Sequence, residues 1–231
     1  MPDYGTDSCA ERLTIEIARV LGVETADVAL AVRHEERGVI SERIDGELRH
    51  GNELLSGIWP GYDTDKKGPV PGYDLVSIKA VLDGYRGGWS LDLSAFECFA
   101  GLLVFDALVG NTDRHHENWA VVQNTQTLAP SFDHGASLGF NASARQMTDP
   151  TGFVRKARAR HFGRDKSPLE LAREALGMVT PQVSELWIGR VAAFETTRVP
   201  AGVWRSWTMR RSTSWCVSTS RSVSRTTTGC R

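Results

Sequence analysis

Apolar residues recur at helical spacing in five stretches of the chain. The strongest pattern covers residues 94–109, and Gly110-Asn111 behind it is typical of a helix end. A second clear pattern covers residues 10–21 and stops before Gly22. The buried face predicted for this helix consists of Leu13, Ile17, Val20 and Leu21. Three more helices are predicted over residues 75–83, 168–177 and 181–195.

Short apolar runs on either side of polar turns predict two hairpins. Residues 28–32 and 38–44 flank a charged turn, and residues 119–123 and 127–128 flank Asn124-Thr125. The Pro- and Gly-rich stretch 57–74 predicts a loop. Helices with small hairpins in front of them and among them indicate an α+β fold.

Composition narrows the class of protein and its partners. The four cysteines are far apart, so neither a disulfide framework nor a cysteine metal site is indicated, and a reducing, cytoplasmic environment is expected. The most apolar window is interrupted by Asp106 and predicts no membrane span, so no membrane partner is expected. Acidic residues exceed basic ones before residue 199, which argues against direct binding to nucleic acid.

The C-terminal segment 199–231 differs in composition from the rest of the chain. It holds six arginines and three tryptophans but no Leu, Ile, Lys, Asp or Glu, and it has no helical or strand period. We expect it to be unstructured. A translation outside the ancestral reading frame is the favoured interpretation, and a genuine basic tail is the alternative.

The candidate chemistry lies directly after the strongest predicted helix. Phosphoryl transfer needs a carboxylate that orients the acceptor hydroxyl, an amide oxygen on the metal and a second carboxylate on the metal. Asp113, Asn118 and Asp133 supply these groups in this order. The spacing places the first two in one short loop, and the predicted hairpin can return Asp133 to the same place.

These residues carry a family resemblance. The segments Gly110-Asn111-Thr112-Asp113-Arg114-His115 and Leu128-Ala129-Pro130-Ser131-Phe132-Asp133, together with Asn118, resemble the kinase domain of HipA-like serine/threonine kinases. The match is specific over residues 94–140 and weaker over residues 8–93. The resemblance implies a protein-kinase-like fold with a small N-lobe over residues 1–50 and a mainly helical C-lobe over residues 51–198.

The resemblance also implies roles for individual residues. Asp113 would be the catalytic base, His115 a supporting residue of the loop, and Asn118 and Asp133 the ligands of Mg²⁺. The activity implied is transfer of the γ-phosphate of ATP to a Ser or Thr of a protein substrate. Some members of the family are toxins, so an antitoxin partner is possible by analogy.

The N-terminal region departs from the family pattern. Glu11 is the candidate for the glutamate that pairs with an ATP-anchoring lysine, which would lie on a strand before the first helix. The first lysine of the chain is Lys66, and no glycine-rich phosphate loop precedes Glu11. We therefore expect a truncated N-lobe and little or no kinase activity from the chain as it stands.

Simpler interpretations remain beside the kinase hypothesis. Asp113, Asn118 and Asp133 could do no more than stabilise turns. His115-His116-Glu117 could suggest zinc, but no second cluster in the sequence would complete the site. The basic run 155–161 could bind phosphate or an acidic substrate, but a solvated helix face is the favoured interpretation. A phosphatidylinositol kinase, or a non-catalytic remnant that only binds a partner, are the alternative functions.

Overall fold

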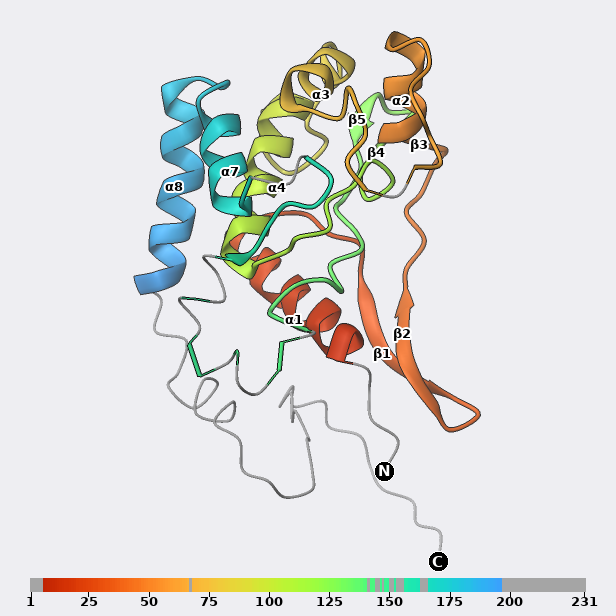
Figure 1. Cartoon of the computed structure of the whole chain (residues 1–231), viewed down its shortest axis with the longest axis vertical. Coiled ribbons are helices and arrows are strands. Elements are labelled where there is room, and N and C mark those ends of the chain that lie inside the picture. The colour runs from red at the N-terminus through yellow and green to blue at the C-terminus, as the bar shows by residue number, and fades with distance from the viewer. Residues whose placement is uncertain are drawn as a thin grey trace, which may run out of the picture. The chain divides into compact units, whose positions relative to one another are not determined.

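The structure is a computed structural model that describes residues 6–66, 68–140, 142–143, 146, 148–149, 152, 156–162 and 166–196 (Figure 1). The predictions for residues 199–231 lie outside the described residues. The helices are α1 (Thr6–Leu21), α2 (Gly51–Ile58), α3 (Leu75–Leu82), α4 (Ala95–Val109), α7 (Pro168–Leu176) and α8 (Pro181–Thr196). The strands are β1 (Val28–Arg33), β2 (Glu36–Ser41), β3 (Leu48–His50), β4 (Ala120–Val122) and β5 (Thr127–Leu128). All five predicted helices and both predicted hairpins are confirmed.

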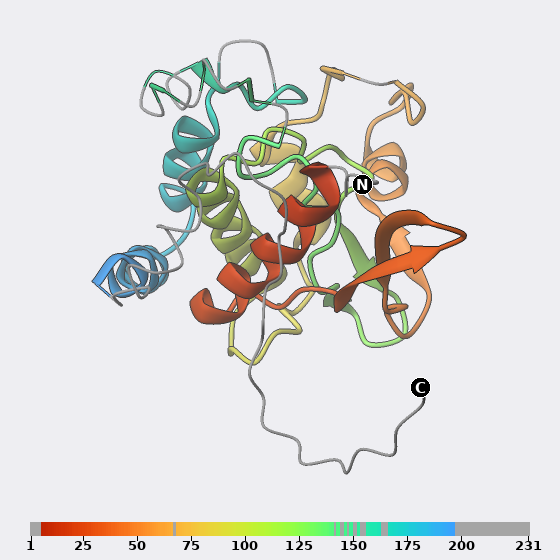
Figure 2. The same ribbon diagram turned by 90° about the horizontal axis from the view of Figure 1, so that it is seen from below.

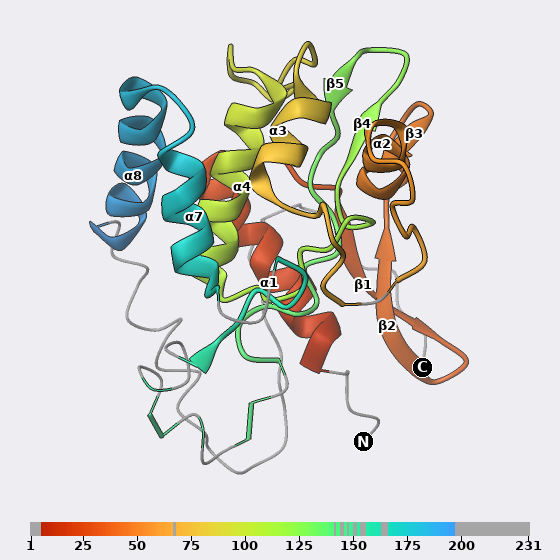
Figure 3. The ribbon, with the colours of Figure 1, turned by 45° about the horizontal axis from the view of Figure 1, so that its top comes forward.

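Helix α4 forms the centre of the described part of the chain. It begins with a capping box, in which Ser94 Oγ accepts from the Glu97 N–H and Glu97 accepts from the Ser94 N–H. It ends at Gly110, whose left-handed backbone (φ 69°) suits glycine. Most of its residues are buried on every side, which is typical of a central helix. Helices α1, α3, α7 and α8 contact it (Figures 1 and 3).

Helix α8 packs on α4 through a close contact between a glycine and a tryptophan. Trp187 is 2% exposed, and its Nε1 donates to the Glu97 carbonyl at 3.0 Å. A Cβ atom placed on Gly101 would overlap the Trp187 indole. The absence of a side chain at Gly101 therefore lets the indole lie against the backbone of α4.

The strands form two small sheets. Strands β1 and β2 pair antiparallel around a turn in which His34 and Glu35 have positive φ values of 48° and 70°, and Figure 2 shows this hairpin in orange. Strands β3, β4 and β5 form the second sheet, with β4 in the middle (Figure 3). Its register pairs Leu48 with Val122, and Val121 with Leu128. Strand β3 and helix α2 were not predicted: β3 has only three residues, and α2 contains Gly51, Asn52 and Gly57, which are poor helix formers.

Two sequence expectations need correction. Val20 is 61% exposed and does not belong to the buried face of α1. That face consists of Ala10, Glu11, Thr14, Ile15, Ala18 and Leu21, whereas the predicted Leu13 and Ile17 are half-buried. Strand β2 ends at Ser41 and not at residue 44, and residues 42–44 have no strand partner and line a cavity described below.

Mixed α and β structure is confirmed, whereas the division into lobes at residue 50 stays a prediction. In the part of the chain that the structure describes, no helix is long and apolar enough to cross a membrane. The core is one main cluster around α4, and a smaller one lies under the second sheet.

Candidate functional site

A buried ion pair ties the end of α4 to the loop that carries Asp113. Arg114 donates through Nε and Nη2 to the two carboxylate oxygens of Asp106, both at 2.9 Å. Each side chain is 3% exposed. Asp106 also accepts from Asn111 Nδ2 at 2.9 Å. This pair explains why a charged residue interrupts the most apolar helix, because a buried charge needs a partner.

The same guanidinium joins the two halves of the predicted site. Arg114 Nη1 donates to the backbone carbonyl of Asn118 at 2.6 Å and to that of Phe132 at 3.1 Å. Because one nitrogen bonds both carbonyls, Asn118 and Asp133, which follows Phe132, are held in one neighbourhood. The structure thus brings together two residues that a whole hairpin separates in the sequence.

The loop from Asn111 to Asn118 satisfies many of its own polar groups. The Asp113 N–H donates to Asn111 Oδ1 at 3.0 Å, and the His115 N–H donates to the Asp113 carbonyl at 2.9 Å. The Asn118 N–H donates to the His115 carbonyl at 3.0 Å, and the Glu117 N–H donates to His115 Nδ1 at 3.2 Å. Asn118 Nδ2 closes the loop by donating to the Asp113 carbonyl at 2.9 Å. These bonds hold the turn without using the Asp113 carboxylate.

The Asp113 carboxylate is partly open to solvent and is hydrogen-bonded to a histidine. Its side chain is 39% exposed, and its Oδ1 lies 2.7 Å from His161 Nε2. The hydrogen bond from His161 lowers the pKa of Asp113 by more than burial raises it. An ionised carboxylate of this kind can accept a hydrogen bond from an incoming hydroxyl.

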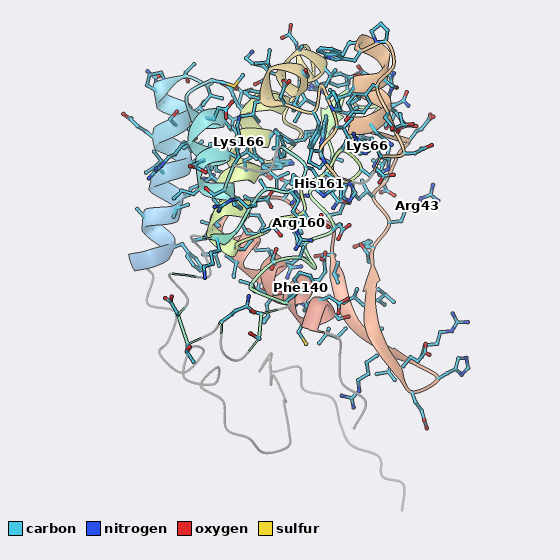
Figure 4. The ribbon with its side chains drawn as sticks, in the orientation of Figure 1. Arg43, Lys66, Phe140, Arg160, His161 and Lys166 are labelled. Carbon is cyan, nitrogen blue, oxygen red and sulfur yellow. The ribbon has the colours of Figure 1, made fainter. Side chains whose placement is uncertain are left out.

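His161 was not identified from the sequence. The basic run 155–161 was predicted to be a solvated helix face, but residues 157–161 are not helical and the His161 side chain is only 12% exposed. The Arg160 N–H donates to the Thr112 carbonyl at 3.2 Å, which brings the segment onto the loop. Arg160 and His161 are labelled in Figure 4. No local pattern reveals a contact across 48 residues. Arg155 lies outside the described residues.

The donor set at Asn118 and Asp133 fits Mg²⁺ bound together with a nucleotide. Asn118 is 4% exposed, and because its Nδ2 is engaged by the Asp113 carbonyl, its amide oxygen remains for a cation. Asp133 is exposed and has a left-handed backbone (φ 58°), a conformation that occurs at functional sites. The described residues include no cluster of three or more His, Cys, Asp or Glu for a metal. Mg²⁺ usually completes its shell with phosphate oxygens and water.

Glu11 reaches this region from helix α1. Its carboxylate accepts a short hydrogen bond from the backbone N–H of His134, the residue after Asp133. Glu11 is 8% exposed, and burial raises its pKa from 4.5 to about 7. No ion pair of Glu11 occurs among the described residues. Its pairing with a lysine therefore stays a prediction, although its position beside Asp133 suits that role.

The adjacent histidines of the loop have different surroundings. His115 lies beside His161, with ring centroids 5.0 Å apart, and burial lowers its pKa. His116 Nδ1 lies 2.6 Å from the hydroxyl of Tyr62. Within the described residues, the two histidines have different partners, and they do not belong to a group of three ligands that could hold zinc. His115 packs against the partner of Asp113, a position that suits a supporting role.

Two cavities flank the site. One of about 470 Å³ lies beside Phe132. It is lined by Ala26, His50, Phe132 and much of the chain between Ser41 and Leu48. The other, of about 620 Å³, lies on the side of Thr112, Phe140 and Arg160. Sequence patterns did not indicate either cavity, because cavities arise where elements distant in the sequence fail to fill the space between them.

Comparison with known families gives a match over most of the chain. The HipA-like C-terminal domain matches residues 2–193. The chain belongs to this family. The resemblance inferred from the loop and hairpin is thereby confirmed. A comparison with curated protein sequences finds no significant match.

Two solved structures are similar to this HipA-like chain, and one of them shares its fold. The Helicobacter pylori proinflammatory kinase CtkA matches with a TM-score of 0.59 and 17% identity, over 82% of this chain and 68% of that one. Shewanella oneidensis MR-1 HipA, solved with HipB and operator DNA, matches with a TM-score of 0.41 and 15% identity. That match covers 79% of this chain and 55% of HipA. At these identities the similarity to CtkA shows the fold alone.

Proposed function

We propose that this HipA-like chain carries the phosphotransfer site of an ATP- and Mg²⁺-dependent kinase that phosphorylates a Ser or Thr hydroxyl of a protein substrate. The main support is the arrangement around Arg114, whose Nη1 bonds the carbonyls of Asn118 and Phe132 and so holds the loop of Asp113 and Asn118 next to Asp133. The three groups required for phosphoryl transfer thus converge on one loop and one hairpin.

Asp113 is the proposed base. Its carboxylate would accept a hydrogen bond from the acceptor hydroxyl and orient the attacking oxygen. It would take up the proton as that oxygen bonds to the γ-phosphorus and the bond from this phosphorus to the leaving oxygen of ADP breaks. Its lowered pKa keeps it ionised near neutral pH. Asn118 and Asp133 are the proposed Mg²⁺ ligands, and the ion would neutralise charge on the phosphates.

The cavity of about 470 Å³ is the proposed site of the adenine base. Its wall includes Phe132, directly before Asp133, so a nucleotide placed there has its phosphates directed toward the metal ligands. The His50 ring packs edge-to-face on Phe132 at 5.8 Å, and His50 Nδ1 lies 2.9 Å from the Glu117 carbonyl. These contacts connect the cavity to the catalytic loop.

Partners and location follow from the family and remain proposals. We propose a cytoplasmic protein with a protein substrate and, as in toxin members of the family, an antitoxin partner. Co-expression with the product of an adjacent gene, followed by size-exclusion chromatography, tests the antitoxin. Elution of the two proteins in separate peaks would argue against it.

The catalytic roles are tested by two isosteric substitutions. Asp113→Asn is expected to abolish phosphate transfer while Mg²⁺-ATP still binds, because Asp113 acts on the acceptor. Asp133→Asn is expected to weaken Mg²⁺-ATP binding about tenfold or more, since it removes a charged ligand. Calorimetric titration measures binding, and γ-labelled ATP measures transfer.

Asp92→Asn, at an exposed position away from the site, is the matched control and should leave both quantities unchanged. Equal nucleotide affinity in the Asp113→Asn and Asp133→Asn variants would contradict the assignment of roles. Offering dephosphorylated casein and phosphatidylinositol vesicles in parallel separates a protein kinase from a lipid kinase. Failure of the wild-type chain to bind Mg²⁺-ATP would favour a non-catalytic binding protein.

A further inference from the structure

The hydrogen bond between His161 and Asp113 has a defined direction. His161 Nε2 lies 2.7 Å from Asp113 Oδ1. An ionised carboxylate has only acceptor atoms, so Nε2 carries the proton and donates it. The bond occupies one carboxylate oxygen and leaves Oδ2 for another donor.

The backbone on both sides of His161 is attached to the catalytic loop. On one side, the Arg160 N–H donates to the carbonyl of Thr112, the residue before Asp113. On the other side, the Phe162 ring packs on Tyr73 at 4.5 Å between centroids. Tyr73 in turn donates its hydroxyl hydrogen to the carbonyl of Arg114 at 2.9 Å. His161 is therefore held by residues that contact both chain neighbours of Asp113.

The imidazole ring is also confined sideways. The His115 ring lies beside it, with centroids 5.0 Å apart and planes inclined by 60°. The His161 side chain is 12% exposed, whereas the Asp113 side chain is 39% exposed. The ring thus covers one part of the carboxylate and leaves another part open.

We propose that His161 is a positioning residue, which fixes the Asp113 carboxylate so that its free oxygen faces the acceptor hydroxyl. This inference rests on the proposed function, because it takes Asp113 as the base. Rotation of an unrestrained carboxylate would misplace the accepting oxygen, and small errors of position cost large factors in rate. His161 itself does not touch the substrate in this role.

Substitution of His161 by alanine and by glutamine tests the proposal. His161→Ala is expected to slow single-turnover transfer from γ-labelled ATP to dephosphorylated casein by about 10- to 100-fold. The dissociation constant of Mg²⁺-ATP should stay within about twofold, because His161 contacts no proposed nucleotide ligand. His161→Gln retains an N–H donor near the place of Nε2 and is expected to recover most of the rate. His34→Ala, on the exposed β1–β2 turn, is the matched control.

Three results would overturn the proposal. Transfer by His161→Ala at the wild-type rate would show that the hydrogen bond is dispensable. Equal loss in the alanine and glutamine variants, with an equal fall in melting temperature, would assign His161 a purely structural role. The weak transfer expected of the wild-type chain is not such a result; absence of Mg²⁺-ATP binding would refute the proposed function, and the positioning role with it.

The contact itself is tested without activity, by ¹⁵N NMR of the histidine side chains. The wild-type chain should show His161 as the Nε2–H tautomer with a slowly exchanging ring proton, and Asp113→Ala should remove that protection. A solvent-exchanging His161 ring in the wild type would contradict the geometry whatever the activity assays show.

Discussion

Arg114 and Asp106 form a two-point ion pair that is almost completely withdrawn from solvent, and the loop carrying Asp113 is built around it. Asp106 lies in the last turn of α4, whereas Arg114 lies in the loop. Removing one partner of such a pair leaves an uncompensated buried charge, which is costly.

Asp106→Asn is therefore expected to lower the free energy of unfolding by about 3–5 kcal/mol. Urea denaturation measures this change. The exposed pair Lys166–Glu174 provides the control, because its side chains are 41% and 44% exposed. Glu174→Gln should cost less than about 1 kcal/mol. Similar losses in the two variants would show that the buried pair is not a major stabilising contact.

Glu11 should make stability depend on pH. Its pKa is raised by burial from 4.5 to about 7, so between these values the folded chain keeps a proton that the unfolded chain has lost. The contribution of Glu11 to the free energy of unfolding is therefore fully present below about pH 4.5, and it is lost as the pH rises toward 7. At about 1.36 kcal/mol per pKa unit, the fall is at most about 3 kcal/mol.

Glu11→Gln should remove this slope while keeping an acceptor for the His134 N–H. Denaturation at about pH 5 and about pH 8 in the presence of EDTA measures the difference. Glu185→Gln, at an exposed position of α8, should retain the wild-type slope. An unchanged slope in Glu11→Gln would mean that Glu11 is not the group responsible.

Gly101 and Gly189 should respond in opposite directions to the same substitution. Gly101→Ala forces a methyl group into the Trp187 indole and is expected to destabilise the fold by about 1–3 kcal/mol. A Cβ atom placed on Gly189, in α8, would have no atom of the described chain within 4 Å. Gly189→Ala is thus expected to stabilise by about 0.5–1 kcal/mol through helix propensity. Melting temperatures of the two variants on the same side of wild type would contradict this packing.

Filling the proposed adenine cavity should weaken nucleotide binding selectively. Ala26 is 7% exposed and lines the cavity, so Ala26→Leu is expected to raise the dissociation constant of Mg²⁺-ATP about tenfold, through about 1–3 kcal/mol of steric cost. Ala192→Leu, on the exposed side of α8, is the matched control for added volume. Unaltered affinity in Ala26→Leu, with an intact fold, would place the nucleotide elsewhere.

Features with a local signal were predictable from the sequence. Helix α4, its end at Gly110 and the hairpin leading to Asp133 follow from periodicity and turn residues, and they suffice to place Asp113 and Asn118 in one loop. Periodicity was less reliable for α1, where apolar Val20 is exposed and polar Thr14 is fully buried.

Features that depend on distant pairs were not predictable. The contact of His161 with Asp113 and the pairing of β3 with β4 depend on how separated elements meet, and neither leaves a pattern in its own segment. Asp106 shows the same limit: the sequence reveals a charge in an apolar helix, but only the structure reveals that Arg114 compensates it.

The hydrogen bonds within the loop Asn111 to Asn118 have a consequence for its dynamics. Several of its backbone donors bond to the loop itself, and Arg114 anchors it to α4, so the loop can open only if part of the core opens with it. Its amides should therefore exchange with deuterium at rates closer to those of α4 than to those of surface loops. The entropy of ordering this loop is then lost during folding, so a nucleotide that binds as proposed would meet groups that are already in place.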